Sequence, residues 1–512
     1  TEYAYNDPWE TTVTHSIGRS NRTVKNARGL VLYVEDSGTG DDGKRVTAKM
    51  GFAYDEAGSR VKKTDLNGAT MSLNIDNAFF SPGSKDMSGS NVAVWRYDGF
   101  GQLIECSDPD LGYMKAEYDG FGGMTARTDA RGLRTTMTYD EFGRLTGKIL
   151  PGDEGAVRYV YDEGENAKGK LTAIDDPFQV KRLEYDRVGR VTHEEREIKG
   201  VSTVFESEFT YDLLNRTKTI QYPLDPVTDK RITTKYEYCA YGVTGIRITQ
   251  GIFRNKDVID RVTYNEFGQM DLISRGNDTL TTYMYDIRGR LVHLVTKKGS
   301  DTLQDVKYDF RIDNSIQAKE DSFGENDAAR KVRCEYSYDG LNRLADASGE
   351  YLHGTDETKA RRFHHGYSYS LNGNMSGKTL YDTATNIAED RWTYAYNNHA
   401  VSSIHSGKSG NRFEMAYDAA GNMIRQEDAE NKITKEMEYD SSNRITKVTD
   451  PDKGKLVGEY RYDDQGFRVR KIAAEIVNGA EAKVEVLYPS MYFVMETQKN
   501  ADGSDIPNTA YA

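Results

Sequence analysis

Apolar and polar residues alternate along most of the chain with a period of two, and clusters of Asp, Gly and Asn interrupt this alternation about every ten residues. Trp95 and Tyr97 precede one such cluster, and Met137 and Tyr139 precede another. A period of two predicts strands with one buried face, and the clusters predict tight turns. Helical periodicity is hard to find. The pattern therefore predicts an all-β protein of consecutive β-hairpins.

One seven-residue motif repeats throughout this pattern. It reads YDGFGQL at 97–103, YDGFGGM at 118–124 and YDEFGRL at 139–145, so both spacings are 21 residues. A fixed period of this kind is the signature of a repeat architecture. Eleven copies begin at Tyr97, Tyr118, Tyr139, Tyr185, Tyr211, Tyr264, Tyr285, Tyr338, Tyr369, Tyr417 and Tyr439. We assign copies with one extra residue to Tyr54, Tyr241 and Tyr462, and degenerate copies to Tyr161, Tyr308 and Tyr396.

Each motif position has a mechanical role in a hairpin. The Tyr ends a half-buried strand, the Asp accepts backbone N–H bonds in the turn, and Gly at the fifth position supplies the positive φ of a type I turn with a bulge. We expect Arg at the sixth position to point to the wetter face and to pair with acidic neighbours across the strands. The residues predicted to form this structural site are Tyr97, Asp98, Gly101, Tyr118, Asp119, Gly122, Tyr139, Asp140, Gly143, Arg144, Tyr185, Asp186, Gly189, Arg190, Tyr285, Asp286, Gly289, Arg290, Tyr417, Asp418 and Gly421.

The repeat also sets the expected organisation of the chain. Residues 1–53 are predicted to be degenerate N-terminal β repeats, 54–488 the repeat region, and 489–512 a C-terminal tail. Phe80 to Asn91, rich in Ser and Gly, is predicted to be irregular, and Asn500 to Asn508 to be a loop.

Composition narrows the functional classes. With 512 residues and a net charge of −13, a nucleic-acid or anionic-membrane surface is not expected, and no apolar run is long enough for a membrane span. Hydrophobic residues make up only 37%, yet there are 35 Tyr, which is unlike a disordered chain. The three Cys suit neither a disulfide framework nor a zinc site. The chain begins Thr1-Glu2, which suggests a piece of a longer protein.

Catalytic and metal sites are not evident either. The recurrent Asp residues occupy turn positions, and the set His353, His364 and His365 lacks the companion spacing of a metal site. We therefore expect no catalytic residue, no metal and no cofactor in this chain.

Three architectures accept a hairpin every 21 residues. A β-propeller would need alternation at about 43 residues, which is not evident. A wall-binding solenoid would rely on Trp side chains to bind its ligands, and the chain contains only three Trp, which are too few. A long ribbon of roughly 46 strands that winds around itself should be hollow, because barrels of 16 to 18 strands already leave a lumen. We expect the third.

Repeated YDxxGRL units, as at 139–145, 185–191 and 285–291, resemble the YD-repeat or RHS family. This family includes bacterial polymorphic toxins, the B and C components of Tc toxin complexes and animal teneurins. The resemblance implies a β-ribbon wound into a hollow cocoon that encloses a C-terminal toxic effector until delivery. It also implies an aspartate-dependent autoprotease in a core segment that follows the shell.

This chain shows no segment like that core signature, so we expect the autoprotease and the effector to lie beyond it or in another chain. The resemblance implies a non-catalytic shell of a secreted bacterial RHS toxin. Its expected partners are the enclosed effector, in cis or from a companion chain, and other toxin-complex or secretion-system components. The alternative is a secreted or cell-surface adhesion module of the teneurin type, and an enzyme is the third possibility.

Overall fold

The computed structural model describes residues 2–7, 9–15, 18–65, 92–226, 228–251, 253–324, 330–353, 360–477, 480–499 and 505–511. The stretch predicted to be irregular, Phe80 to Asn91, lies outside the described residues. In the described part of the chain, 41 strands form one sheet and no helix occurs. Every strand pairs antiparallel with the strand before it and the strand after it in sequence, as β9–β10–β11 show. The predicted all-β ribbon of consecutive hairpins is confirmed.

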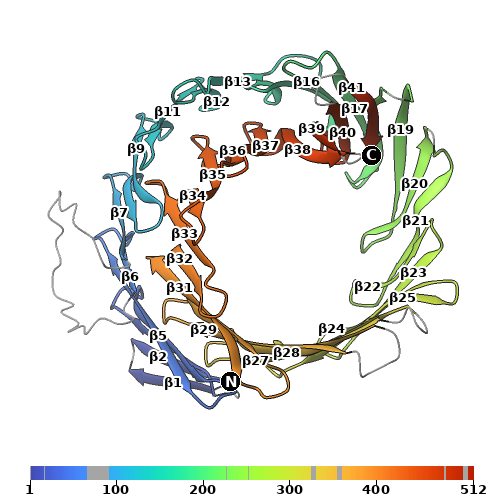
Figure 1. Cartoon of the computed structure of the whole chain (residues 1–512). Coiled ribbons are helices and arrows are strands. Elements are labelled where there is room, and N and C mark those ends of the chain that lie inside the picture. The colour runs from blue at the N-terminus through green and yellow to red at the C-terminus, as the bar shows by residue number, and fades with distance from the viewer. Residues whose placement is uncertain are drawn as a thin grey trace.

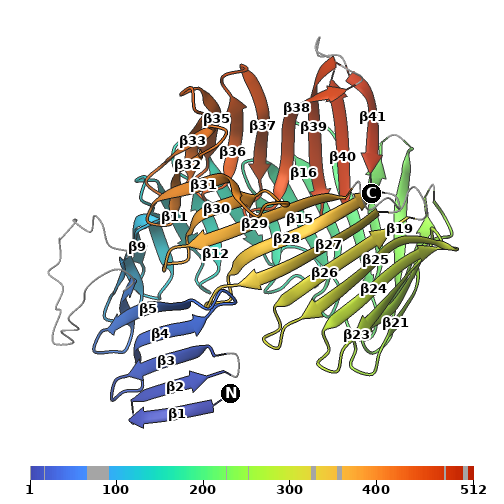
Figure 2. The ribbon, with the colours of Figure 1, turned by 60° about the horizontal axis from the view of Figure 1, so that its bottom comes forward.

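The ribbon curls round a central space and then passes over its own beginning (Figure 1). Seen from the side, the later strands lie above the earlier ones, so the ribbon rises as it winds (Figure 2). We call β1 to β26 the first winding and β27 to β41 the second winding. This is the hollow, spiralling shell expected from the repeat.

The strands of the first winding are β1 (Glu2–Asp7), β2 (Glu10–Thr14), β3 (Ser20–Lys25), β4 (Val31–Thr39), β5 (Arg45–Tyr54), β6 (Arg60–Asp65), β7 (Val92–Tyr97), β8 (Leu103–Asp108), β9 (Gly112–Tyr118), β10 (Met124–Thr128), β11 (Arg134–Tyr139), β12 (Leu145–Ile149), β13 (Ala156–Tyr161), β14 (Leu171–Asp175), β15 (Gln179–Tyr185), β16 (Val191–Ile198), β17 (Val204–Tyr211), β18 (Thr217–Asp225), β19 (Lys230–Tyr238), β20 (Val243–Gln250), β21 (Lys256–Tyr264), β22 (Met270–Arg275), β23 (Thr279–Tyr285), β24 (Leu291–Lys298), β25 (Asp301–Phe310) and β26 (Ile316–Phe323).

The strands of the second winding are β27 (Arg330–Tyr338), β28 (Leu344–His353), β29 (Arg361–Tyr369), β30 (Met375–Tyr381), β31 (Ala388–Asn397), β32 (Ala400–Ser406), β33 (Arg412–Tyr417), β34 (Met423–Glu427), β35 (Ile433–Tyr439), β36 (Ile445–Asp450), β37 (Lys455–Tyr462), β38 (Arg468–Val477), β39 (Ala480–Ser490), β40 (Phe493–Lys499) and β41 (Asp505–Tyr511).

The two edges of the ribbon differ because hairpin turns alternate between them. Turns that follow odd-numbered strands carry the YD motif, as at 98–102 and 140–144, and we call this side the motif edge. Turns that follow even-numbered strands, as at 109–111 and 129–133, form the opposite edge. The ribbon therefore has two distinct edges along its length, and the YD motif occurs on only one of them.

Three features differ from the sequence-based expectations. The motif strands end at Tyr238 and Phe310 rather than at Tyr241 and Tyr308, because aromatic residues two or three apart leave the turn position ambiguous. The copies at Tyr54 and Tyr462 do not contain the extra residue that we assigned to them. Each Tyr pairs with the seventh residue of its motif, as Tyr139 pairs with Leu145, but in these two copies the seventh residue is Arg. The segment predicted to be a loop at Asn500 to Asn508 ends inside strand β41, which pairs with β40.

Candidate functional site: the repeat turn and the seam between windings

The turn aspartates of the repeat hold the backbone of each hairpin. Asp186 Oδ1 accepts the N–H groups of Val188 and Arg190, both at 3.0 Å, and Gly189 has a φ of 83°. An ionised Asp has no donor of its own, so it can accept hydrogen bonds from both N–H groups. Without it, water would have to bind these two N–H groups. The same pair of bonds is made in the turns of Asp98, Asp119, Asp140, Asp286 and Asp418.

The motif tyrosines connect each repeat to the one before it. The hydroxyl of Tyr211 donates to the backbone carbonyl of Val191 at 2.6 Å, and Tyr139 donates to that of Met124 at 2.9 Å. In both cases the acceptor is the seventh residue of the preceding motif. Equivalent bonds are made by Tyr54, Tyr118, Tyr161, Tyr185, Tyr238, Tyr264, Tyr285, Tyr338, Tyr369, Tyr396, Tyr417 and Tyr439. We call this series of hydroxyl–carbonyl bonds the tyrosine ladder. It was not predicted from the sequence, although the consistent choice of Tyr at a position where Phe would pack equally well indicates that the hydroxyl has a partner.

The motif arginines also reach into the next repeat. Arg190 Nε donates to Asp186 Oδ2 at 2.7 Å, and its guanidinium lies 4.7 Å from the ring centroid of Tyr211. Arg144 over Tyr161, Arg216 over Tyr238, Arg290 over Phe310, Arg343 over Tyr369 and Arg444 over Tyr462 repeat this stacking. The expectation that these arginines pair with acidic neighbours across strands holds for Arg144, which pairs with Asp162 at 2.8 Å, but the pairing that recurs is with the Asp of their own turn. The planar guanidinium satisfies the carboxylate of its own turn and an aromatic face together.

The carboxylates of four motif turns, those of Asp140, Asp186, Asp212 and Asp286, have a lowered pKa. The backbone N–H of Arg190, and then its guanidinium, hold the pKa of Asp186 below its ordinary value. A lowered pKa means that the stability from this turn is present above the ordinary Asp pKa of about 3.9 and is lost as the pH falls through the lowered value. The turn of Asp186 is therefore weakened by strong acid.

The tyrosine ladder predicts a small stability effect that depends on one hydroxyl. Tyr211→Phe keeps the ring but leaves the carbonyl of Val191 without its donor, so we expect the free energy of unfolding to fall by about 1 kcal/mol. Urea unfolding followed by tyrosine fluorescence measures this. The matched control is Tyr241→Phe, since Tyr241 is 59% exposed in a turn and should change stability far less. Equal losses in both variants would contradict the ladder.

The second feature that the repeat builds is a seam, where the motif edge of the second winding lies on the opposite edge of the first winding. Asp41 accepts the N–H of Tyr338 at 2.9 Å and pairs with Arg311 at 2.7 Å. Glu154 accepts the N–H of Ser441 at 2.8 Å and its hydroxyl at 2.6 Å. Further contacts join Asp110 to His399, Pro109 to Asn398, Arg131 to Asp440 and Tyr159 to Asp464. Along the seam the partners are 270 to 309 residues apart in sequence.

Small residues allow close approach at one end of the seam. A Cβ placed on Gly340 would lie 2.0 Å from the carbonyl oxygen of Gly38, and a Cβ on Gly38 would lie 2.2 Å from that of Gly340. Both values are shorter than any real Cβ contact, so only Gly fits at this crossing of the two windings. Gly112 approaches the carbonyl of Ala419 in the same way, at 2.3 Å.

Apolar side chains hold the other end of the seam. Phe205 and Phe493 have ring centroids 6.5 Å apart, and each is 1–2% exposed. They belong to a buried cluster that joins β16–β18 to β38–β40, with Ile198, Ile220, Tyr222, Val469, Leu487 and Met495. This cluster is the largest patch of core shared by the two windings among the described residues.

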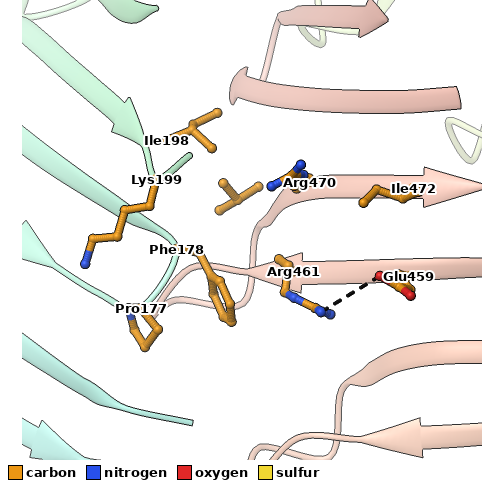
Figure 3. Close-up of a pocket in the computed structure, with 9 residues that line it drawn as sticks. Pro177, Phe178, Ile198, Lys199, Glu459, Arg461, Arg470 and Ile472 are labelled. Carbon is orange, nitrogen blue, oxygen red and sulfur yellow. Dashed lines mark ion pairs between the residues drawn. The ribbon is translucent and has the colours of Figure 1, made fainter. Parts of the chain in front are cut away.

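A small pocket and a group of acidic residues lie between these two ends. The pocket has a volume of about 270 Å³ and is lined from the first winding by Pro177, Phe178, Ile198 and Lys199, and from the second winding by Glu459, Arg461, Arg470 and Ile472 (Figure 3). Beside it, Asp176 and Asp463 are 1% and 3% exposed. Burial raises the pKa of both carboxyl groups, which no other turn of the repeat shows among those with a resolved shift.

The other sequence candidates do not form a catalytic or metal centre in the described part of the chain. His364 Nε2 lies 2.7 Å from Asp346 Oδ2 and its ring stacks on Tyr381, whereas His365 lies against Phe363. No group of three or more His, Cys, Asp or Glu among the described residues is placed to hold a metal ion. Nor does any described helix have the length and apolar character needed to span a membrane.

Comparison with known proteins finds a repeat family in two parts of the chain and a known fold for nearly all of it. The RHS Repeat family model matches residues 118–154 and 417–455. No curated protein sequence matches the chain. Among solved structures, the TcdB2-TccC3 crystal structure is similar with a TM-score of 0.81 and 18% identity, over 99% of this chain and 27% of that one.

Two further structures agree. The Photorhabdus luminescens Tc holotoxin pore has a TM-score of 0.78 at 18% identity, over 99% of this chain and 26% of that chain. The TcdB2-TccC3 structure without its hypervariable C-terminal region has a TM-score of 0.79 at 19% identity, over 98% and 26%. This chain thus spans about a quarter of the length of these chains, and the likeness concerns the fold. Together with the two repeat matches, it shows that the chain contains RHS repeats and has the hollow shell fold of the Tc toxin structures.

Proposed function

We propose that this chain is part of the wall of a protein container that encloses a toxic effector polypeptide until delivery. The observation that carries the proposal is the seam. A ribbon that only coiled would leave its windings unconnected, whereas here hydrogen bonds and side-chain packing join the windings at described turns from Asp41 to the cluster of Phe205. A wall whose windings are joined to each other is what a container needs.

The role of the chain itself is structural in this proposal. The motif aspartates are committed to backbone N–H groups and to arginines, so they serve the wall and not a reaction. Because its structural neighbours are Tc toxin complexes, we propose a secreted bacterial toxin complex as the setting, with the effector in cis or from a companion chain.

The free motif edge of the first winding supports a further contact with another part of such a complex. Large apolar residues at the third or fourth motif position are more than half exposed there, namely Phe100, Phe121, Phe142, Val188, Leu213, Leu214, Tyr241, Phe267 and Ile287. In the second winding, the same positions are mostly small or polar, namely Gly340, Ala419, Ala420, Ser441, Ser442, Asp464 and Gln465, and the large apolar exceptions are Leu341 and Leu371. A row of exposed apolar side chains usually marks a contact surface. We propose that this rim is covered by the rest of the container wall.

Protease protection tests the container. We expect the full-length protein, purified from the cells that make it, to retain a polypeptide that resists trypsin while the seam is intact. Gly340→Ala should expose that polypeptide to cleavage, whereas Gly99→Ala, at the same motif position but with open space around it, should not. If the polypeptide is cut equally fast in all three proteins, or if none is retained, the container proposal fails. Loss of cell binding on changing exterior turns alone would favour the adhesion module instead.

A further inference from the structure

One motif turn in the seam, that of Asp463, has neither a cation nor an amide side chain at its sixth position. In the turns of Asp140, Asp186, Asp212, Asp286, Asp339 and Asp440, Arg at the sixth motif position pairs with the turn carboxylate. At Asp463 the sixth position is Phe467, which offers its backbone N–H at 2.8 Å and no charge. The following Arg468 lies over the rings of Tyr460 and Tyr488. Asp463 thus receives no cation from its own turn, as is also true of Asp98 and Asp119, but unlike these two it is buried, at 3% exposed.

A second acidic side chain from the first winding is buried at the same place. Asp176 Oδ1 accepts the N–H groups of Phe178 at 2.8 Å and Gln179 at 2.9 Å, but Asp176 Oδ2 has no hydrogen-bond partner. Gln179 Oε1 also has none, and both side chains are 1% exposed. An ionised, unpaired carboxylate in such a place is costly, and a proton on it would supply a missing donor.

The charged groups around these two acids are engaged elsewhere. Lys199 Nζ donates to the backbone carbonyl of Asp176 at 2.6 Å and pairs with Asp175. Arg444 donates to the backbone carbonyl of Asp463 at 2.7 Å. Three further arginines also have acidic partners: Arg196 pairs with Glu194, Arg461 lies near Glu459, and Arg470 pairs with Glu485. The hydroxyl of Tyr159 donates to Asp464 Oδ2 at 3.0 Å. The seam therefore places the buried carboxyl group of Asp176 within electrostatic range of those of Asp463 and Asp464, while the nearby cations bind other acceptors.

We propose that this part of the seam is a protonation-dependent latch, which holds the two windings together more tightly when Asp176 and Asp463 are protonated and loosens as they ionise. The role of a latch rests on the proposed container function, whereas the pH dependence of the contact between the windings does not. In a container, the wall would resist opening at lower pH and open more readily as the pH rises.

The direction follows from linkage. Burial raises the pKa of Asp176, and the charges of Asp463 and Asp464 add to this. Burial also raises the pKa of Asp463, against the N–H of Phe467 and the charge of Arg196, while Asp464 raises it. A raised pKa in the closed seam means that the stabilisation is complete below the ordinary Asp pKa of about 3.9 and is lost as the pH rises through the raised value. This is the reverse of the turn of Asp186, where acid weakens the structure.

Hydrogen exchange of the seam strands, β13–β15 and β37–β38, tests the latch between pH 4.5 and 8 after correction for intrinsic exchange. In the wild type, protection should decrease as the pH rises, by about tenfold for each unit by which a pKa is raised. Asp463→Asn and Asp176→Asn should each reduce this dependence and give strong protection at pH 8. Asn is compatible with such a turn, because Asn265 accepts the N–H groups of Phe267 and Gln269 in the same way, both at 3.0 Å.

Asp186→Asn is the matched control, since its turn lies on the free edge and contains Arg190. It should leave the pH dependence of the seam unchanged. Seam protection that is independent of pH in the wild type, or that keeps its wild-type pH dependence in both seam variants, would overturn the latch. Exchange requires no enclosed polypeptide, so this result is separate from that of the protease experiment.

Discussion

Phe205→Ala is expected to lower the free energy of unfolding by about 3–5 kcal/mol, the largest effect of any substitution considered for this chain. Phe205 lies on β17 and is 1% exposed, and its ring contacts Phe493 on β40. Its removal leaves a cavity between the two windings, and the hydrogen-bonded strands on either side, β16–β18 and β39–β40, limit how far the structure can collapse into that space. Urea unfolding gives the total loss, and hydrogen exchange of β16–β18 and β38–β40 gives its location.

Phe121→Ala provides the control for this prediction. Phe121 is fully exposed at a motif turn of the first winding, so the same truncation should change stability by well under 1 kcal/mol. A loss of similar size in both variants would show that the cluster of Phe205 does not hold the seam.

Gly340→Ala is expected to separate the windings at the other end of the seam, at a cost of about 1–3 kcal/mol. The added methyl group would meet the backbone of Gly38, which cannot rotate away as a flexible side chain would. Hydrogen exchange of β4, β5, β27 and β28 should therefore increase. Urea unfolding measures the accompanying loss of stability.

Gly99→Ala is matched to this change, because Gly99 occupies the same third motif position with nothing near its Cβ site. Alanine lowers the entropy of the unfolded chain, so this variant should be unchanged or slightly more stable, by up to about 1 kcal/mol. The two Gly→Ala changes should thus differ in sign. If both destabilise equally, the close approach of Gly340 and Gly38 does not govern the seam.

Sequence reasoning succeeded where the information is local. Period-two alternation and turn residues describe neighbouring atoms, so strands such as β11 and β12 and the turn between them follow from the residues at 139–145. It failed where two local solutions are nearly equivalent. Tyr308 and Phe310 are both aromatic and two apart, and only the turn geometry at Asn314, with a φ of 72°, places Phe310 at the motif position.

The seam could not be predicted because its partners are far apart in sequence and have no common pattern. Nothing in the residues around Glu154 indicates Ser441 as a partner, since the pairing depends on the length and curvature of all the hairpins between them. The departure at Phe467 was visible in the sequence, but its meaning depends on Asp176, which reaches Asp463 only through the winding. Local chemistry thus defines the hairpins, and the accumulated geometry of the whole ribbon defines the latch.

The turn after β4 meets the end of β27 and the turn after β12 meets the turn after β35, so facing turns are separated by the same number of strands although the number of residues between them varies. The number of hairpins is therefore itself a determinant of the structure. Removal of one hairpin between them, for example β23 and β24, would move every later motif turn back by one place relative to the first winding. Asp464 would then take the place of Ser441 and face Glu154, carboxylate against carboxylate, where a hydroxyl and an N–H now donate. Each seam pair therefore forms only when the chain between its two partners contains the correct number of hairpins.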